Sequence, residues 1–303
     1  MSKYAFVLSC SKNYMYGLNA ILNALDYYGN TADVHVLWLE HNVREFDKMS
    51  PIFLEKLRKQ PFNFKVHIVN IFDVIKPFKY KMGSNVWVLK FSRWKYLDSI
   101  KDDYDSICAL GADIVVTDNI MEWFEVTANT DFIVTGRNAL GSYKFHSDVP
   151  VHTNDTPCAD VPAYFNPKTH NDFSEKIWEI GMKYNMGDMP AFYFAAKATN
   201  KRMILLPDNL WIRNFSTMND RLHHNLGCYK QKNEKIFLES TVMRHKVSMI
   251  HGKWWAKGHV YKRAKDAEGA PNHKLVKDNV ELYHKLFKLF NTEHKLQVEW
   301  LDV

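Results

Sequence analysis

The 303-residue sequence has few cysteines and no long apolar segment. Its four cysteines are Cys10, Cys108, Cys158 and Cys228, and no two of them have the Cys-x-x-Cys spacing. This scarcity argues against a zinc site and against a disulfide scaffold, and it is typical of a reducing compartment. No window reaches the roughly 18 apolar residues that a membrane-spanning helix needs. We therefore expect a soluble, cytoplasmic protein without a transmembrane segment.

The sequence also lacks the glycine motifs of two common nucleotide-binding loops. No Gly-x-Gly-x-x-Gly follows the first apolar segment, and no Gly-x-x-x-x-Gly-Lys-Ser/Thr occurs anywhere. Dinucleotide-binding and P-loop proteins need these glycines to cradle phosphate, so the sequence argues against both classes. Glycine and proline together make up only 22 residues, and no low-complexity linker dominates. With 46% hydrophobic and 24% charged residues, the composition is that of a globular protein.

Charge is unevenly distributed along the chain, whose net charge is +6. Residues 1–200 contain 21 Lys and Arg and 23 Asp and Glu, a net charge of −2. Residues 201–303 contain 19 and 11, a net charge of +8. A basic end of this kind suits a phosphate-bearing partner such as a nucleotide, a nucleic acid or an anionic membrane. It is equally compatible with a lysine-rich surface that meets only solvent.

Hydrophobic periodicity predicts alternating strands and helices in the first quarter of the chain. Continuous apolar runs indicate strands covered on both faces, and apolar residues at helical spacing indicate the helices between them. The predicted strands are residues 4–10, 34–39 and 64–69, and the predicted helices are 14–28 and 45–59. This order predicts a parallel sheet with helices on both faces.

The rest of the chain continues the same alternation. Strands are predicted at residues 107–116, with a turn-like break, and at 132–136 and 202–207; helices are predicted at 87–97, 119–124, 172–183 and 278–290. Residues 138–163 form a polar stretch without periodicity, which predicts a functional loop or lid. A further helix opens around Gly187, with Asp188 as its predicted N-cap. No internal repeat or clear domain boundary is present.

Two segments carry side chains suited to a metal and a diphosphate. Asp113 follows an apolar strand, and in open α/β sheets ligands bind beyond the carboxyl ends of strands. A carboxylate there can hold a divalent cation that bridges to a diphosphate. In the segment His251-Gly252-Lys253, the imidazole can bind Mn²⁺, the glycine admits backbone close to phosphate, and the lysine adds positive charge. A strand-end aspartate and a core histidine are the structural alternatives.

The order of these motifs resembles the GT-A glycosyltransferases, and within them glycosyltransferase family 8, which includes glycogenin and bacterial galactosyltransferases. In that family a loop ending in Asn-Tyr follows the first strand and holds the nucleotide base. Ser11, Asn13 and Tyr14 occupy that place here. The resemblance implies that Tyr14 stacks on the base. It also implies that Lys90, upstream of the metal motif, contacts the sugar diphosphate.

The later motifs extend this resemblance over about residues 4–257. The family pattern Tyr-Asp-x-Val-x-x-Leu-Asp-x-Asp is similar to residues 104–113, and its Asp-Gln step is similar to Asp188-Met189. The Leu-Pro-x-x-Trp-Asn pattern resembles residues 206–214, and the closing His-x-x-Gly-x-x-Lys-Pro-Trp motif resembles residues 251–254 in shortened form. The resemblance therefore implies that Asp113 and His251 bind Mn²⁺ or Mg²⁺. It places Gly252 and Lys253 at the diphosphate.

Three positions depart from the family pattern. Gly111 replaces the first aspartate of the Asp-x-Asp pair, so either metal affinity is reduced or Asp105 or Asp118 substitutes. Met189 replaces a glutamine that lies near the anomeric carbon in the family. Ser11 stands where the base-binding loop often has aspartate, which leaves the selection of uracil open.

The resemblance implies transfer of a sugar from a nucleotide-sugar, a UDP-sugar by likeness to the family, to an acceptor hydroxyl with retention at the anomeric carbon. The metal and Lys253 would stabilise the leaving diphosphate. Asp188 is the first candidate for orienting the donor sugar, and Asp160 and Asn166 fall in the region that contacts donor sugar or acceptor. The implied catalytic GT-A domain spans residues 1–257, and residues 258–303 form a basic helical C-terminal extension.

Two questions stay open at the level of sequence. Because of Gly111 and Met189, the alternative to an active transferase is a non-catalytic relative that binds a nucleotide-sugar or glycan. The basic C-terminal third admits three acceptors: an oligosaccharide, a lipid-linked glycan at a membrane surface, or DNA that carries a hydroxylated base. Alternating aromatic and basic residues at 254–263 suit stacking on sugars or bases, and they also suit a loop packed over the donor.

Overall fold

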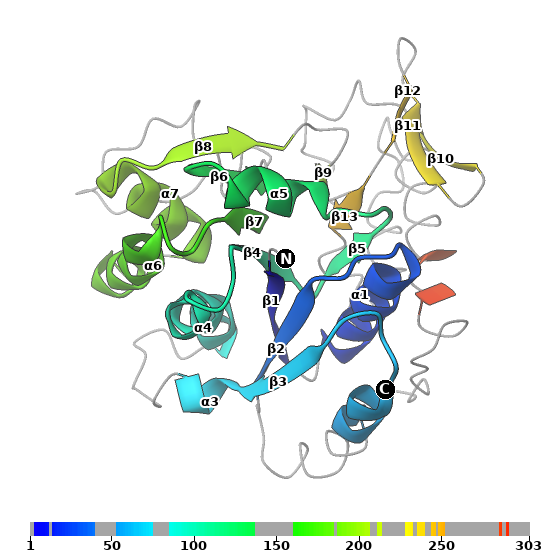
Figure 1. Cartoon of the computed structure of the whole chain (residues 1–303), viewed down its shortest axis with the longest axis horizontal. Helices are drawn as coiled ribbons and strands as arrows, with labels where there is room; N and C mark the ends of the chain where they lie inside the picture. The colour runs from blue at the N-terminus through cyan, green and yellow to red at the C-terminus, as the bar shows by residue number, and fades with distance from the viewer. Residues whose placement is uncertain are drawn as a thin grey trace, which may run out of the picture.

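The computed structural model describes residues 3–11, 14–39, 53–74, 85–136, 160–184, 187–206, 211–213, 228–232, 235–239, 244–246, 248–251, 285–286 and 289–290. In these residues a mixed, mostly parallel central sheet is flanked by helices (Figure 1). The α/β fold class predicted from the sequence is therefore confirmed.

The central sheet has seven strands in the order β3-β2-β1-β4-β7-β6-β8. They are β1 (Tyr4–Ser11), β2 (Asp33–Leu39), β3 (Val66–Asn70), β4 (Ser106–Gly111), β6 (Phe132–Gly136), β7 (Asp160–Phe165) and β8 (Arg202–Leu205). β1 pairs in parallel with β2 and β4, and β2 with β3, whereas β7 is antiparallel to β4 and β6. The carboxyl ends of β1 to β4 thus share one edge, which we call the C-terminal edge. The opposite side is the N-terminal edge.

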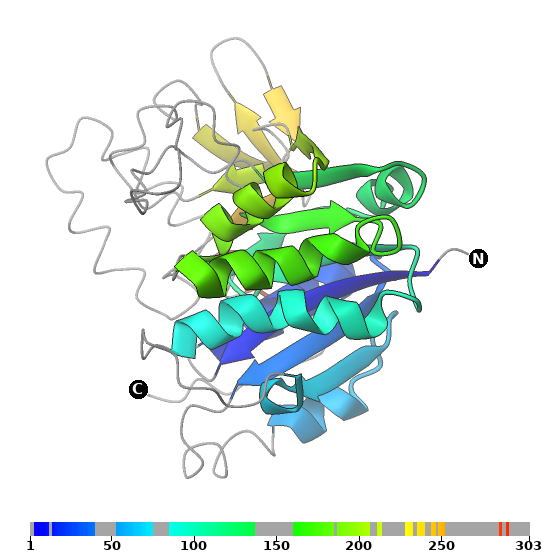
Figure 2. The same ribbon diagram turned by 90° about the vertical axis from the view of Figure 1, so that its left-hand side faces the viewer.

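Helices cover both faces of this sheet because the side chains of each strand alternate between the faces. The helices are α1 (Met15–Tyr27), α3 (Ile71–Val74), α4 (Asn85–Ile100), α5 (Glu122–Ala128), α6 (Asn171–Tyr184) and α7 (Asp188–Ala198). The Ser9 hydroxyl lies 3.4 Å from that of Ser92 in α4, whereas Phe6 turns the other way and its ring lies 4.9 Å from that of Phe124 in α5. Figure 2 shows α4, α6 and α7 together over the first of these faces.

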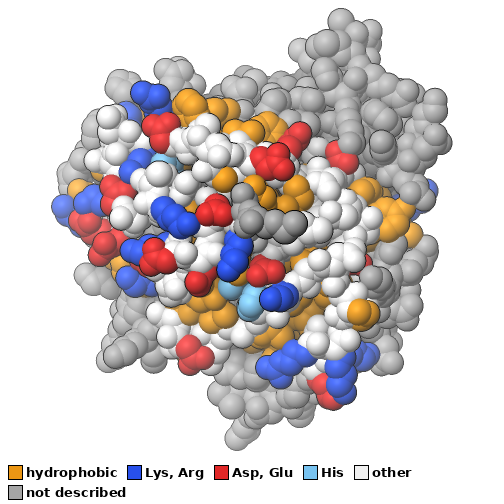
Figure 3. Space-filling view, viewed as in Figure 1, with side chains coloured by type: hydrophobic (Ala, Val, Ile, Leu, Met, Phe, Trp, Pro, Cys, Tyr) orange, Lys and Arg blue, Asp and Glu red, His pale blue; other side chains and the backbone are white. Residues whose placement is uncertain are grey.

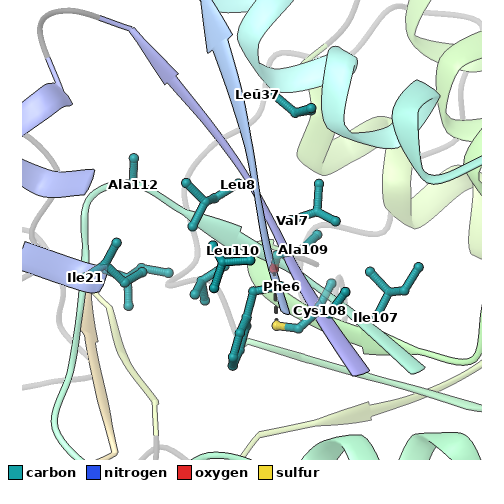
Figure 4. Packing of buried hydrophobic residues seen from close by; sticks show 14 of the residues in the cluster. Phe6, Val7, Leu8, Ile21, Leu37, Ile107, Cys108, Ala109, Leu110 and Ala112 are labelled. Carbon is teal, nitrogen blue, oxygen red and sulfur yellow. Dashed lines mark hydrogen bonds between the residues drawn. The ribbon is translucent and has the colours of Figure 1, made fainter. Parts of the chain in front are cut away.

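The core lies around β1 and β4, where four consecutive residues of β1 and five of β4 are fully buried. Register places Leu8 beside Leu110 and Val7 beside Ala109. Figure 4 shows Leu8 and Leu110 on the side of Ile21, a residue of α1, and Val7 on the opposite side. Both faces of these strands are dry, which is why their sequences read as continuous apolar runs rather than as alternating patterns.

Two three-stranded sheets accompany the central one. The first contains β5 (Ile114–Val116), β13 (Met249–His251) and β9 (Trp211–Arg213), in the order β5-β13-β9. The second is antiparallel and contains β10 (Cys228–Lys232), β11 (Lys235–Glu239) and β12 (Arg244–Lys246). The turn-like break predicted within residues 107–116 is confirmed, because β4 and β5 belong to different sheets.

The structure corrects the prediction of a loop over residues 138–163. Its last four residues belong to β7, a central strand of the sheet, and residues 137–159 lie outside the described part of the chain. The strand was hidden because it contains Pro162, which cannot donate a ladder hydrogen bond. The register between β6 and β7 shifts between Thr135 and Gly136, opposite this segment, so the proline lies at an irregularity of the pairing.

Smaller differences concern helix ends. The helix predicted at residues 119–124 is α5, and it begins three residues later and ends at Ala128. Of the helix predicted at 45–59, residues 53–59 are helical and residues 45–52 lie outside the described residues. Helix α4 extends beyond both predicted ends, to Asn85 and Ile100.

Four residues of the predicted C-terminal helix are described, and one of them, Phe290, packs against α1. Leu286 and Phe290 are buried, and the Asn23 amide donates a hydrogen bond of 2.6 Å to the Phe290 carbonyl. The Phe290 ring centroid lies 5.8 Å from that of Tyr27. The division at residues 257 and 258 stays a prediction. No helix of the described residues has both the length and the apolar character to cross a bilayer.

Gly181 in α6 provides a direct test of the packing between α4 and α6. A Cβ atom at this position would lie 2.3 Å from the Phe91 ring, and Phe91 is fully buried. In the interior of a solvent-exposed helix, Gly→Ala raises the free energy of unfolding by about 1 kcal/mol. Here we expect Gly181→Ala to lower the free energy of unfolding by about 1–3 kcal/mol, as overpacking does. Urea denaturation measures the change.

Phe91→Leu supplies the matching control because it shortens the obstructing side chain. In the Phe91→Leu background, Gly181→Ala should lower the free energy of unfolding by less than it does in the wild type. Equal costs in the two backgrounds would show that the ring is not the obstacle.

A buried histidine near the N-terminal edge provides a pH-dependent test. His35 of β2 bonds through Nδ1 to the Tyr96 hydroxyl and through Nε2 to the Tyr104 hydroxyl, each at 2.8 Å. Tyr104 in turn donates to Asp33 at 3.1 Å, and the His67 ring stacks on His35 with centroids 4.4 Å apart. Burial first and His67 second lower the pKa of His35 to about 4, although Asp33 opposes the shift.

We expect stability to fall as His35 is forced to take up a proton. The pKa is about 4 in the folded protein and about 6.5 when unfolded, so the contribution of neutral His35 is complete above pH 6.5 and falls away toward pH 4. The loss between pH 7 and pH 4 is about 3 kcal/mol for this group. Measuring the free energy of unfolding of the wild type and of His35→Gln across this pH range separates the contribution of His35 from that of the carboxylates. Their stability difference should shrink at low pH; a constant difference would contradict the assignment.

Candidate functional site

The candidate site lies at the C-terminal edge, where β1 and β4 end beside each other. Ser11 is the last residue of β1, and Ser9 pairs with Gly111, the last residue of β4. Asp113 follows two residues later in a turn and is half-buried. Beside it, Tyr14 immediately precedes α1. Ser11, Tyr14 and Asp113 therefore share one end of two neighbouring strands. The predicted base-binding residue Asn13 lies outside the described residues.

Tyr14 and Asp113 influence each other electrostatically. Burial raises the pKa of the Tyr14 phenol, and the negative charge of Asp113 raises it further. A carboxylate perturbs a phenol in this way only at short range. Tyr14 thus stays protonated, and its ring lies within electrostatic range of the Asp113 carboxylate.

His251 reaches this edge through the pairing of β13 with β5. The two strands are antiparallel, and His251 lies directly opposite Ile114, the residue after Asp113. Opposite residues in such a ladder have Cα atoms about 4.5–5.5 Å apart. The backbone register thus brings together Asp113 and His251, which are far apart in the sequence. The residues that follow, Gly252 and Lys253, lie outside the described residues.

Asp188 supplies a second, buried carboxylate. Its side chain is 3% exposed, and it forms ion pairs with Lys90 at 3.2 Å and with Arg93 at 2.5 Å. Burial alone would raise the pKa of Asp188, but the charges and hydrogen bonds of Lys90 and Arg93 outweigh it and hold the pKa below its usual value. Asp188 is therefore an ionised group. Its two cationic partners come from consecutive turns of α4.

The structure corrects the predicted N-cap of α7. Gly187 occupies the N-cap position, with extended backbone, and Asp188 is the first helical residue. Its carboxylate is directed to α4 instead of to its own helix. α6 ends and α7 begins at the C-terminal edge, because α6 follows β7 from the opposite edge. Asp188 and Lys90 thus lie toward the same edge as Asp113.

Of the two remaining predicted residues, one lies at this edge and one does not. Asp160 opens β7 opposite Gly136, the carboxyl end of β6, and so is placed by the backbone at the C-terminal edge. Asn166 follows the other end of β7, at the N-terminal edge. Its side-chain NH₂ group donates to the Ala128 carbonyl at 3.2 Å, and its side-chain Oδ1 accepts from the Lys168 backbone N–H at 2.9 Å. Asn166 closes a turn there, away from Asp113.

Neither carboxylate considered as a substitute for Gly111 lies near Asp113. Asp105 precedes β4 at the N-terminal edge, where it accepts from the Lys3 backbone at 2.9 Å and from the Lys168 ammonium at 3.0 Å. Asp118 lies beside the turn before β2, since its carbonyl accepts from Asn30 at 3.4 Å. The N-terminal edge is the face turned toward the viewer in Figure 3, and it carries acidic and basic side chains interspersed. The possibility of substitution is thereby removed.

Two residues near the candidate site escaped the sequence analysis. Arg93 is 6% exposed and pairs with Asp188; its only sequence signal is its position three residues after Lys90 on a helix. Arg213 lies next to His251 in the β13–β9 ladder. Within the described side chains, no three histidine, cysteine, aspartate or glutamate residues are close enough together to hold a metal ion.

No protein-family model and no curated protein sequence matches this chain. Solved structures do match it. A structure of the galactosyltransferase LgtC with donor and acceptor sugar analogs superposes with a TM-score of 0.54 at 14% identity, over 97% of this chain and 98% of the other. An active-site mutant of LgtC gives 0.52 at 14% identity, over 82% and 86%. The chain has the GT-A fold.

The bifunctional glycosyltransferase WbbM is another structural neighbour of this GT-A protein. Its apo structure superposes with a TM-score of 0.57 at 11% identity and covers 92% of this chain. The chain spans about half of WbbM, because the match covers 52% of that protein. These neighbours are glycosyltransferases by name, and the likeness is one of architecture.

Proposed function

We propose that the protein is a glycosyltransferase that moves a sugar from a nucleotide-sugar to an acceptor hydroxyl, with retention of configuration at the anomeric carbon. A UDP-sugar is the first candidate for the donor. The observation that carries this proposal is the β5–β13 register, which sets His251 opposite the residue next to Asp113. The GT-A fold of the structural neighbours supports it. So does the gathering of Ser11, Tyr14 and Asp188 toward the same edge of the sheet.

Asp113 and His251 are the residues that would hold a divalent cation. A carboxylate oxygen and an imidazole nitrogen both suit Mn²⁺, whereas Mg²⁺ would prefer oxygen alone. Two protein donors leave coordination positions for diphosphate oxygens and water. Bound there, the cation would neutralise charge on the departing nucleoside diphosphate. Gly252 and Lys253 follow His251 directly, so backbone and ammonium would approach the same phosphates.

The remaining residues of the edge act on the base and the sugar in this proposal. Tyr14 offers its ring to the nucleotide base, and Ser11 ends the neighbouring strand β1 at the same edge. Asp188, ionised between Lys90 and Arg93, orients donor hydroxyls or stabilises positive charge that develops on the ring. Lys90 is 42% exposed, which leaves its ammonium able to contact both Asp188 and a donor phosphate. Asp160 belongs to the same region. Asn166 is not part of this proposal, because it lies at the opposite edge.

A thermal-shift experiment tests the donor and the metal together. A ligand that binds only the native state must raise its melting temperature. We expect UDP and UDP-sugars to raise it with Mn²⁺ present, and expect EDTA to abolish the shift. ADP and GDP are the matched controls for the base. No shift with any nucleoside diphosphate, with or without metal, would contradict the proposal.

A non-catalytic nucleotide-sugar-binding protein is the second candidate, and Gly111 and Met189 favour it. Gly111 removes one acidic group from the metal motif, and Met189 removes a polar group from the position after Asp188. Hydrolysis of the donor separates the two candidates. Thermal stabilisation by a UDP-sugar with release of UDP over time supports the transferase. Stabilisation without release supports the binding protein.

A further inference from the structure

A pocket of about 500 Å³ opens at the N-terminal edge of the central sheet. Its lining comes from the starts of β1 and β2, the turn before β4, the segment between β5 and α5, and α5 itself. Tyr4 begins β1 in this pocket, whereas Ser11 ends β1 at the candidate site. The two ends of an eight-residue strand lie roughly 23 Å apart. The pocket is therefore separate from the candidate site.

Two tyrosines in the lining of this pocket are held in place by their neighbours. Tyr104 is 6% exposed, and its hydroxyl donates to Asp33 at 3.1 Å and lies 2.8 Å from His35 Nε2. The Tyr4 ring stacks on that of Phe124, with centroids 5.2 Å apart and planes 10° from parallel. A ligand that meets these side chains does not have to order them, which removes part of the entropic cost of binding.

The rim of the pocket is fixed by hydrogen bonds between two turns. The Asn119 side chain donates to the Gly29 carbonyl at 3.0 Å and accepts from the Met121 backbone N–H at 2.9 Å. The Ile120 backbone N–H donates to the Asn30 side chain at 2.9 Å. These bonds join the turn between α1 and β2 to the segment between β5 and α5. The opening is thus a preformed part of the fold.

The charges that line the pocket are of both signs and nearly balanced. Lys3 contributes one ammonium, and Asp33 and Glu125 contribute two carboxylates. The charge of Asp33 is partly compensated, because its carboxylate accepts from Tyr104 and lies 3.5 Å from His67 Nε2. This leaves Glu125 to oppose Lys3. An anionic ligand would meet the carboxylates and a cationic ligand the ammonium, so the lining favours a ligand without net charge.

We propose that this pocket binds a neutral sugar residue, at a site distinct from that of the proposed transfer. Sugar hydroxyls both donate and accept, and the exposed side chains of Lys3, Thr31 and Glu125 supply a donor, a donor and acceptor, and an acceptor. The rings of Tyr4 and Tyr104 add flat apolar surface beside these polar groups, which suits the apolar face of a sugar ring. The volume lies within the usual range of small-ligand pockets. Binding here does not depend on the proposed transfer.

Saturation-transfer NMR with the full chain tests this proposal. The probes are the methyl glycosides of glucose, galactose, mannose and N-acetylglucosamine, with spermidine and inorganic phosphate as charged alternatives. We expect at least one glycoside to bind the wild type. Thr31→Trp, which fills the pocket from an exposed position, should abolish this binding, and Glu125→Ala should weaken it about tenfold by removing a charged acceptor. Glu122→Ala is the matched control, because it makes the same change at an exposed position of α5 outside the lining, and it should bind like the wild type.

Four outcomes would overturn the proposal. They are absence of binding by all four glycosides, glycoside binding that survives Thr31→Trp, equal weakening by Glu122→Ala and Glu125→Ala, and tighter binding of spermidine or phosphate that Thr31→Trp removes. The melting temperature of each variant without ligand shows that it is folded. The shift caused by UDP and Mn²⁺ should be the same in Thr31→Trp as in the wild type, because Thr31 lies at the opposite edge from the candidate site. Failure of the pocket is thereby distinguished from failure of the proposed transfer.

Discussion

Asp188→Asn should lower the free energy of unfolding by about 3–5 kcal/mol, because it leaves a buried guanidinium without its counter-ion. Arg93 is 6% exposed and its Nε has no hydrogen-bond partner, so the carboxylate at 2.5 Å is the main compensation for its charge. Lys90, the other partner of Asp188, is itself a cation and cannot compensate the charge of Arg93. Urea denaturation at pH 7 measures the loss.

A double-mutant cycle distinguishes this pair from general damage to the core. Arg93→Met fills similar volume without charge, so Arg93→Met/Asp188→Asn should lose much less stability than the sum of the single variants. Glu55→Gln, which breaks the exposed Lys59 pair, is the control and should leave the midpoint unchanged. Strict additivity of the two single changes would contradict the coupling.

The pH dependence of the same variant has a definite sign. The pKa of Asp188 lies below its usual value in the folded protein, so its contribution is complete above the ordinary aspartate range and is lost as pH falls through the folded pKa. The stability difference between wild type and Asp188→Asn should therefore narrow in acid. A difference that grew in acid would mean that the aspartate is protonated at neutral pH.

The alternation of strands and helices was predictable from the sequence because a strand that is buried on both faces has a continuous run of apolar residues. Tyr4–Ser11 and Ser106–Gly111 are mostly apolar, and both are central strands. β7 has no such run, since Pro162 and the polar residues before it read as a loop. Pairing at an irregular register accommodates that proline, and such a compensation is a property of the assembled sheet.

The candidate site shows the same limit at the level of single residues. Asp113 and His251 each suggested a metal ligand by residue type, but only the pairing of β5 with β13 brings their backbones together. Asn166, Asp105 and Asp118 were equally plausible by type, yet strand direction places them at or toward the N-terminal edge. Arg93 was missed because a basic residue three positions from another on a helix normally faces solvent, whereas here both converge on the buried Asp188.

Asp113→Asn should reduce metal-dependent turnover of the donor at least about a hundredfold while the protein stays folded. Substitution of residues that only support metal ligands lowers metal affinity or activity about 10- to 100-fold. Loss of a direct ligand should lower them by no less. Gly111 sharpens the expectation, because it leaves no second acidic residue in the motif to take over. Release of UDP from a UDP-sugar, titrated with Mn²⁺, measures the effect.

Asp118→Asn is the matched control, since it makes the same chemical change five residues away, beside the turn before β2. It should leave both turnover and the response to Mn²⁺ unchanged. His251→Ala should reproduce the defect of Asp113→Asn, because the β5–β13 register gives the two residues one common neighbourhood. If instead Asp113→Asn retained the wild-type response to Mn²⁺ and His251→Ala alone lost it, the shared cation would be refuted. The strand pairing would then serve the fold and not the chemistry.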